Sequence, residues 1–207
     1  MVKSQVGELQ MPQRILLGAG PSSVHPRVLQ AMTAPVVGFL DPSFFKVMDE
    51  VCEMLRQVFH TSNTTTFPVS ATGTGAMETA CANIIERGDT VVVCRNGYFG
   101  NRLADIAERC GADVRLVDRP WGKPVDVEGL ARELKKHSKV KAVGVVNAET
   151  STGVLTPLPE IVELAHQHEA LVIVDAVTSL GGHDSLVPRV AGRYRTEVMA
   201  RRSLHRE

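Results

Sequence analysis

Short, valine-rich segments alternate with helical patterns along most of the chain, and this alternation limits the possible folds more than any other feature. The expected strands are Thr66–Ser70, Thr90–Cys94, Asp113–Val117, Val140–Val146 and Ala170–Val174. The helices expected between them are Gly75–Arg87, Asn101–Cys110, Val127–His137 and Leu158–His168. Strands that are apolar on both faces and alternate with helices form a mostly parallel sheet, with helices on each side. The sequence therefore predicts an α/β fold, and such sheets bind ligands at the carboxyl ends of their strands.

One more helix is predicted ahead of the sheet, beginning at Pro42. Apolar residues recur there at steps of three and four, which is the period of a helix. They are Phe45, Met48, Val51, Cys52, Leu55, Val58 and Phe59. Asp41, directly before this segment, has the side chain of a good N-cap.

Composition removes several classes of function. The chain has a formal net charge of zero and only 4% aromatic residues, so nothing favours binding to nucleic acid. No apolar run reaches the ~20 residues of a membrane span, and residues 1–14 lack the apolar segment of a signal peptide. The four cysteines are scattered, so we expect a reduced, cytoplasmic compartment. No metal site is expected, since His166 and His168 lie two apart on a helix and point away from each other.

Four segments with polar residues or glycines stand next to predicted strands, where a parallel sheet binds its ligand. The first, residues 70–75, is Ser-Ala-Thr-Gly-Thr-Gly and leads directly into a helix. Glycines let the backbone approach an anion, and a helix N-terminus offers free N–H groups, so this segment suits a phosphate. A helix-capping turn is the alternative. A dinucleotide-binding oxidoreductase is disfavoured, because Glu78 stands where the third glycine of that motif is needed.

Two further segments follow the second and the fourth predicted strand. Asn96–Gly100 holds Tyr98 and Phe99 between two glycines. An aromatic ring there could lie against a planar ligand, although the segment on its own is better explained as a turn whose aromatics join the core. Asn147–Val154 contains Glu149 and three consecutive hydroxyl residues, which suit either a polar ligand or an ordinary polar turn.

Asp175 is the fourth candidate. It follows the apolar run Ala170–Val174, and a carboxylate at the end of a buried strand is costly unless it is paired. A protonated pyridine nitrogen would be a natural partner. A structural salt bridge or a cap is the competing explanation.

In order and spacing, these segments resemble class V aminotransferases, which are pyridoxal-phosphate enzymes of fold type I. The likeness is closest to the alanine–glyoxylate and serine–pyruvate type, and it runs from Gly18–Ser22 through Asp175–Gly182. It implies the large domain of that fold, incomplete here, in a homodimer with pyridoxal 5'-phosphate as cofactor. The implied reaction transfers an amino group from a small amino acid, alanine or serine, to a 2-oxo acid such as glyoxylate or pyruvate.

The resemblance also implies which residues hold the phosphate and the faces of the ring. Thr72, Gly73 and Thr74 would hold the cofactor phosphate. Phe99 would stack on one face of the pyridine ring, and Val177 would pack on the other.

Three more roles follow from the same resemblance. Thr150 would form a hydrogen bond near the ring hydroxyl. Asp175, as a catalytic residue, would pair with the ring nitrogen and keep it protonated, so that the ring can accept electrons from the substrate. Gly20 would lie near the substrate carboxylate.

The family pattern continues beyond this aspartate to a lysine that forms a Schiff base with the cofactor. Its place falls within Met199–Ser203, but the chain has no lysine after Lys141. Arginine stays protonated and cannot replace a lysine as nucleophile. The resemblance thus implies a chain cut off before the catalytic lysine and inactive alone. A non-catalytic protein that binds pyridoxal phosphate or a partner is the alternative.

We expect three parts in the chain. They are an N-terminal loop and arm (residues 1–25), a partial cofactor-binding domain (26–182) and an atypical tail (183–207). The tail holds six arginines and no Ile, Phe or Lys. Our hypothesis is that this tail is read out of frame.

Overall fold

The computed structural model describes residues 10–181 and the backbone of residues 196–199. Contacts divide the chain into two compact units, one that ends at Pro35 and one that begins at Val36. The described part of the first unit is an irregular loop followed by the short helix α1 (Pro26–Ala31). All the other elements belong to the second unit.

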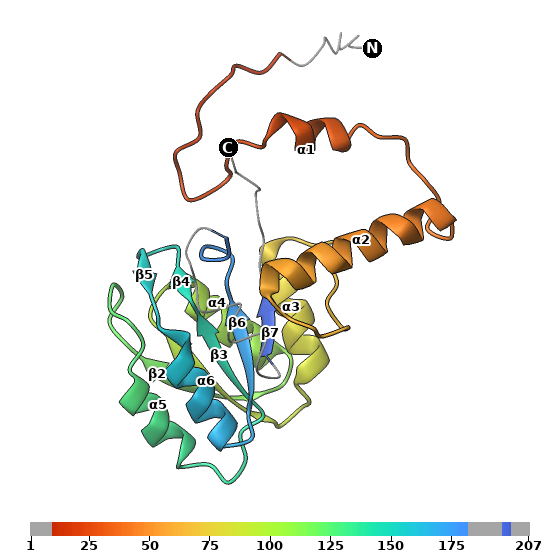
Figure 1. Cartoon of the computed structure of the whole chain (residues 1–207). Coiled ribbons are helices and arrows are strands. Elements are labelled where there is room, and N and C mark those ends of the chain that lie inside the picture. The colour runs from red at the N-terminus through yellow and green to blue at the C-terminus, as the bar shows by residue number, and fades with distance from the viewer. Residues whose placement is uncertain (1–9, 182–195, 200–207) are drawn as a thin grey trace, which may run out of the picture. The chain divides into compact units, whose positions relative to one another are not determined.

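A parallel sheet of five strands forms the centre of the second unit, in the order β2-β1-β3-β6-β7 (Figure 1). Its strands are β1 (Thr90–Arg95), β2 (Asp113–Asp118), β3 (Ala142–Val146), β6 (Leu171–Asp175) and β7 (Thr196–Met199). Every neighbouring pair is parallel. The α/β fold with a parallel sheet is confirmed.

The order of the strands reverses at β1, because the chain continues from β1 to β2 on one side and then returns to β3 on the other. The register pairs Val146 at the end of β3 with Asp175 at the end of β6. The carboxyl ends of these strands therefore lie at the same edge of the sheet, next to the reversal of strand order where α/β proteins bind ligands.

Helices cover both faces of the sheet, as Figure 1 shows. On one face, α5 (Val127–Leu134) and α6 (Leu158–Gln167) pack on alternate strand residues such as Val92, Val143 and Val172. On the other face, α3 (Gly73–Ile84) and α4 (Tyr98–Arg109) pack on residues of opposite parity, such as Val93 and Ile173. Because successive side chains of a strand point to opposite faces, strands covered on both sides are valine-rich throughout.

Helix α2 (Pro42–Phe59) begins where the sequence predicts it. The carboxylate of Asp41 accepts a hydrogen bond from the Ser43 amide at 2.7 Å, so the predicted N-cap is confirmed. None of its residues is buried, and only Val58 and Phe59, at its end, pack on the core. Within the described chain, Phe45 of its apolar stripe is exposed and the other stripe residues are only partly buried.

The predicted strand Thr66–Ser70 is wrong, because this segment has no regular structure. Pro68 lies in its middle and has no N–H to donate to a neighbouring strand. The sequence also failed to predict the hairpin of β4 (Ala148–Glu149) and β5 (Val154–Leu155), whose two-residue strands are too short to show a period.

Strand β7 joins the sheet from within the segment expected to be an atypical tail. It pairs with β6 from Val172↔Thr196 to Asp175↔Met199. The rest of residues 183–207 lies outside the described residues, so the expected tail and its reading frame stay predictions. Among the helices that the structure describes, none is long and apolar enough to cross a membrane. The predicted cytoplasmic location also stays a prediction.

Gly144 tests the packing between β3 and α4. A Cβ at this position would lie 2.8 Å from Cδ2 of the fully buried Leu103. We expect Gly144→Ala to lower the free energy of unfolding by about 1–3 kcal/mol, the usual range for an overpacked core, as measured by urea titration. The control is Gly38→Ala, where nothing lies within 4 Å of the added atom. Equal stability of the two variants would contradict the packing described here.

Candidate functional site

The predicted phosphate-binding segment forms the start of α3. Thr72 is the N-cap, and its hydroxyl oxygen accepts a hydrogen bond from the Gly75 amide at 3.2 Å. Gly73 lies beside the loop that follows β6, since a Cβ added to it would be 3.7 Å from Cγ2 of Val177. The capping turn proposed as an alternative is thus present. It does not exclude a phosphate, because a hydroxyl that accepts one hydrogen bond still has its own hydrogen to donate.

Arg102 is a residue of this region that the sequence analysis missed. One guanidinium N–H donates to the hydroxyl oxygen of Thr74 at 2.7 Å, and another donates to the Tyr98 hydroxyl. The guanidinium also lies 5.0 Å from the centre of the Tyr98 ring. Among the described residues it forms no ion pair with a carboxylate. A cation at the positive end of α3 is unfavourable by itself and becomes favourable when an anion binds there.

A helical spacing could have revealed Arg102. Tyr98 and Arg102 are four residues apart, which places them on one face of a helix. That helix was expected to begin only at Asn101, whereas α4 begins at Tyr98.

Tyr98 and Phe99 lie in the first turn of α4, so the interpretation of this segment as a turn with buried aromatics is wrong. Tyr98 is exposed and Phe99 is half-buried, and their rings meet edge to face at 5.3 Å. An accessible aromatic ring at this edge of the sheet can still pack against a planar ligand.

Asp175 ends β6 and is 5% exposed. One carboxylate oxygen accepts a hydrogen bond from the Val177 amide at 2.9 Å. Burial raises the pKa of Asp175, the Val177 amide lowers it, and the nearby Glu149 carboxylate raises it. Among the described residues no Lys, Arg or His forms an ion pair with Asp175.

Of the two competing explanations for Asp175, a structural salt bridge finds no support among the described residues. The cap is present, because the carboxylate accepts the Val177 amide. This cap still leaves the carboxylate without a cationic partner in the described chain. The Asp175 carboxylate is buried near the Glu149 carboxylate, so a cation that binds beside Asp175 stabilises its charged form. The protonated nitrogen of a pyridine ring is such a cation, so the donor set fits this cofactor.

Val177 lies two residues after Asp175 in the chain, and Thr150 contacts Thr178 of the same loop. Thr150 directly follows β4, and its hydroxyl forms a hydrogen bond with the hydroxyl of Thr178. Val177 is half-buried and lies next to Gly73. The loop after β6 thus contacts both the start of α3 and the segment after β4, which brings the predicted phosphate and ring contacts to one edge of the sheet.

Gly20 belongs to the first unit, so its position relative to this edge is not defined. It is exposed and has a φ of 150°, a conformation that favours glycine. Its role near the substrate carboxylate stays a prediction.

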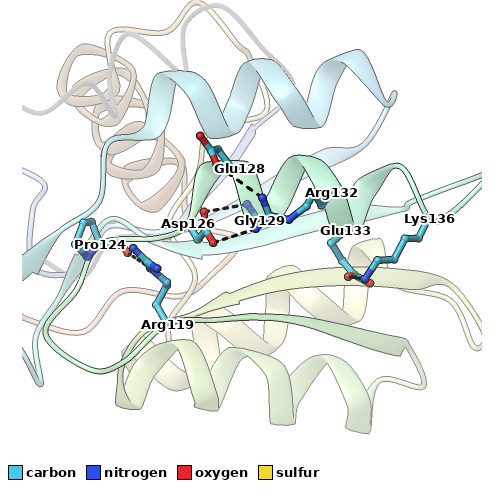
Figure 2. A network of polar contacts seen from close by, with 8 residues as sticks. All are labelled: Arg119, Pro124, Asp126, Glu128, Gly129, Arg132, Glu133 and Lys136. Carbon is cyan, nitrogen blue, oxygen red and sulfur yellow. Dashed lines mark hydrogen bonds and ion pairs between the residues drawn. The ribbon is translucent and has the colours of Figure 1, made fainter.

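A second polar network lies on α5 (Figure 2). Asp126 caps this helix through the Gly129 amide at 2.9 Å, and Glu133 pairs with Lys136 at 2.7 Å. Exposed pairs of this kind are worth about 0–1 kcal/mol, and they explain these charges without a ligand.

Comparison with known proteins identifies the family. The family model Aminotransferase class-V matches residues 15–189. The chain belongs to this family. The match ends inside the segment that was expected to be atypical, and the family's members are pyridoxal-phosphate-dependent aminotransferases.

Two curated relatives show how much of the family this chain covers. It is 44% identical over 175 residues to a (S)-ureidoglycine–glyoxylate transaminase of Bacillus subtilis, covering 84% of this chain and 42% of the relative. It is 41% identical over 174 residues to an alanine–glyoxylate aminotransferase of Rattus norvegicus, with the same coverage. The chain thus spans less than half the length of these relatives.

Among solved structures, an alanine–glyoxylate aminotransferase from Nostoc sp. superposes with a TM-score of 0.86 at 47% identity. The match covers 91% of this chain and 50% of that one. A ureidoglycine–glyoxylate aminotransferase from Bacillus subtilis gives a TM-score of 0.83 at 42% identity, covering 87% of this chain and 46% of the other. The described fold is therefore part of a fold-type I large domain, as the resemblance implied.

Asp175→Asn tests whether the Asp175 carboxylate is buried without a cationic partner. Because burial raises the pKa of Asp175, the folded chain binds more protons than the unfolded chain between the ordinary pKa of 3.8 and the raised one, and stability falls as the pH rises through this window. Asparagine is uncharged and can still accept the Val177 amide. We expect the variant without ligand to melt at a higher temperature near neutral pH, with a gap that closes as the pH approaches 3.8.

The measurement is a series of thermal unfolding curves at several pH values for both proteins. A variant that is less stable than the original near neutral pH would contradict the assignment of Asp175 as an unpaired buried carboxylate.

Proposed function

We propose that this chain binds pyridoxal 5'-phosphate at the carboxyl edge of its sheet, as the cofactor-binding part of an aminotransferase. The observation that carries the proposal is Asp175, a buried carboxylate with no cationic partner among the described residues. It lies on the same edge as a helix N-terminus next to Arg102, which forms no ion pair among the described residues, so a ligand with a cationic ring and an anionic phosphate matches both ends.

In this proposal, separate residues bind the phosphate and the two faces of the ring. Thr72, Gly73 and Thr74 bind the phosphate through hydroxyl and amide groups at the start of α3. Phe99 and Val177 pack on the two faces of the ring. These roles are those implied by the family resemblance, and the proximity of Gly73 to Val177 supports them.

The polar edge of the ring is bound by the remaining residues. Thr150 binds near the ring hydroxyl, and Asp175 holds a proton at the ring nitrogen. When bound, the protonated pyridine ring withdraws electrons from the substrate carbon that loses a proton. Gly20, from the first unit, is proposed to lie near the substrate carboxylate.

The proposed substrates are a small amino acid as donor and a 2-oxo acid as acceptor. Both relatives described above carry glyoxylate in their names, whereas their donors differ, ureidoglycine in one and alanine in the other. Glyoxylate is thus the better supported acceptor, with pyruvate as a further 2-oxo acid. Alanine or serine remains the proposed donor.

The chain as given is proposed to lack transaminase activity on its own. No lysine follows Lys141, and Lys141 itself precedes β3 and pairs with Asp89 at 3.7 Å, before the start of β1. It therefore lies at the amino edge of the sheet, opposite the candidate site. A non-catalytic protein that binds pyridoxal phosphate or a partner is the second candidate function.

A homodimer is also proposed. Phe45, Val47 and Met54 of α2 are each at least half exposed. Large apolar side chains that are exposed in this way are stabilised by contact with another chain.

The function is tested by titrating the 207-residue chain with pyridoxamine 5'-phosphate, which has no aldehyde and cannot bond covalently to surface lysines. We expect saturable binding seen by circular dichroism of the bound ring. With pyridoxal 5'-phosphate, borohydride reduction and peptide mapping should find no single modified lysine, and alanine with glyoxylate should give no turnover. Absence of binding would contradict the proposed site, and one modified lysine together with turnover would contradict the proposed inactivity.

Arg102→Ala tests the phosphate end. Loss of a hydrogen bond from a charged group is worth about 1.5–3 kcal/mol, so affinity for pyridoxamine 5'-phosphate should fall about tenfold or more. Affinity for pyridoxamine, which has no phosphate, should stay the same. The matched control is Arg109→Ala on the same helix, whose side chain is exposed and pairs with Asp105. Equal losses for both ligands would place Arg102 outside the phosphate site.

A further inference from the structure

Glu149 is a fully buried carboxylate at the carboxyl edge of the sheet. Its side chain is 0% exposed, and among the described residues it forms no ion pair. One oxygen accepts hydrogen bonds from the amides of Phe99 and Gly100, at 3.1 and 3.2 Å. The other accepts from the amide and the hydroxyl of Ser151, at 3.1 and 2.7 Å. Both oxygens therefore have two donors each, which a buried carboxylate requires.

These hydrogen bonds join two segments that are far apart in the sequence. The first turn of α4 supplies two donors from its free amides, where the helix dipole favours a negative charge. The Tyr98 amide adds a bond to the Ser151 hydroxyl at 3.0 Å. Glu149 and Ser151 thus hold the start of α4 and the segment after β4 together.

Gly97 shows that this arrangement is closely packed. A Cβ added to Gly97 would lie 2.8 Å from the Oε2 atom of Glu149 and closer still to its Cγ atom. The φ of Gly97 is −178°, which any residue can adopt. Glycine is therefore needed here because the Glu149 side chain fills the space, and the backbone conformation makes no such demand.

Two expected ring contacts depend on this carboxylate. Phe99, proposed to stack on the ring, has its own amide bound by Glu149. Thr150, proposed to bind near the ring hydroxyl, follows Glu149 directly in the chain. The same carboxylate also lies close enough to Asp175 to raise the pKa of that residue, so it acts on the group proposed to pair with the ring nitrogen.

We infer that Glu149 is a positioning residue for the cofactor ring, holding Phe99 and Thr150 in one rigid unit at the distance that the ring requires. This inference rests on the proposed function. Glu149 does not touch the phosphate end of the site, which is built by the first turn of α3, so its effect is confined to the ring.

The test compares two probes on the full chain: pyridoxamine 5'-phosphate, which occupies both ends of the site, and inorganic phosphate, which occupies one. Glu149→Gln keeps the shape of the side chain but replaces one acceptor oxygen by an NH2 group that faces N–H donors. We expect affinity for pyridoxamine 5'-phosphate to fall about tenfold or more. The circular dichroism of the bound ring should change, and affinity for inorganic phosphate should not.

Two further variants keep the test decisive. Glu133→Gln is the matched control, since Glu133 on α5 is a partly buried carboxylate with hydrogen-bond partners outside the site and should leave both affinities unchanged. Ser151→Ala removes one donor to Glu149 and should weaken pyridoxamine 5'-phosphate binding in the same selective way, with a smaller loss. If Glu149→Gln does not fold, a selective loss of pyridoxamine 5'-phosphate affinity in Ser151→Ala tests the positioning role instead.

The outcomes separate this inference from the function on which it rests. Equal loss of both probes, or no loss of either, overturns the positioning role while leaving the proposed function standing. Failure of the unaltered chain to bind pyridoxamine 5'-phosphate overturns the proposed function and the inference with it. A selective loss for pyridoxamine 5'-phosphate in the Glu149 or Ser151 variant supports both.

Discussion

The parallel hydrogen bonding of β1, β3 and β6 brings distant parts of the sequence to one edge of the sheet. Val91 pairs with Ala142, and Ala142 pairs with Leu171, so the three strands run level and end together. Every candidate residue of the second unit ends or follows one of these strands or begins α3, which packs on the sheet. A one-residue shift of one strand would move each of its side chains to the opposite face of the sheet and its terminal residue out of the site.

Two buried carboxylates at this edge have opposite surroundings. Glu149 is saturated by donors of the chain itself and needs nothing further. Asp175 has one amide donor and no cationic partner in the described chain, and burial raises its pKa. We therefore infer different roles for them. Glu149, whose oxygens are fully hydrogen-bonded, holds the structure together, and Asp175 is left to bind a ligand.

The sequence predicted those parts of the fold that repeat with a clear period. The strands β1, β2, β3 and β6 and the helices between them follow from their valines and apolar stripes. The Thr66–Ser70 strand failed because its polar and proline content overrides a short β pattern. The contacts of Arg102 with Thr74 and of Glu149 with Phe99 could not be predicted, since they depend on how strands far apart in the sequence pair and where α4 begins. The resemblance to class V aminotransferases, by contrast, was confirmed over residues 15–189.

The central claim is that Asp175 and the first turn of α3 bind the two ends of one ligand. A crystal structure of the 207-residue chain with pyridoxamine 5'-phosphate tests it most directly. We expect the phosphate at Thr72–Thr74 and the ring nitrogen within hydrogen-bonding distance of the Asp175 carboxylate. A ligand bound elsewhere, or a ring nitrogen turned away from Asp175, would contradict it.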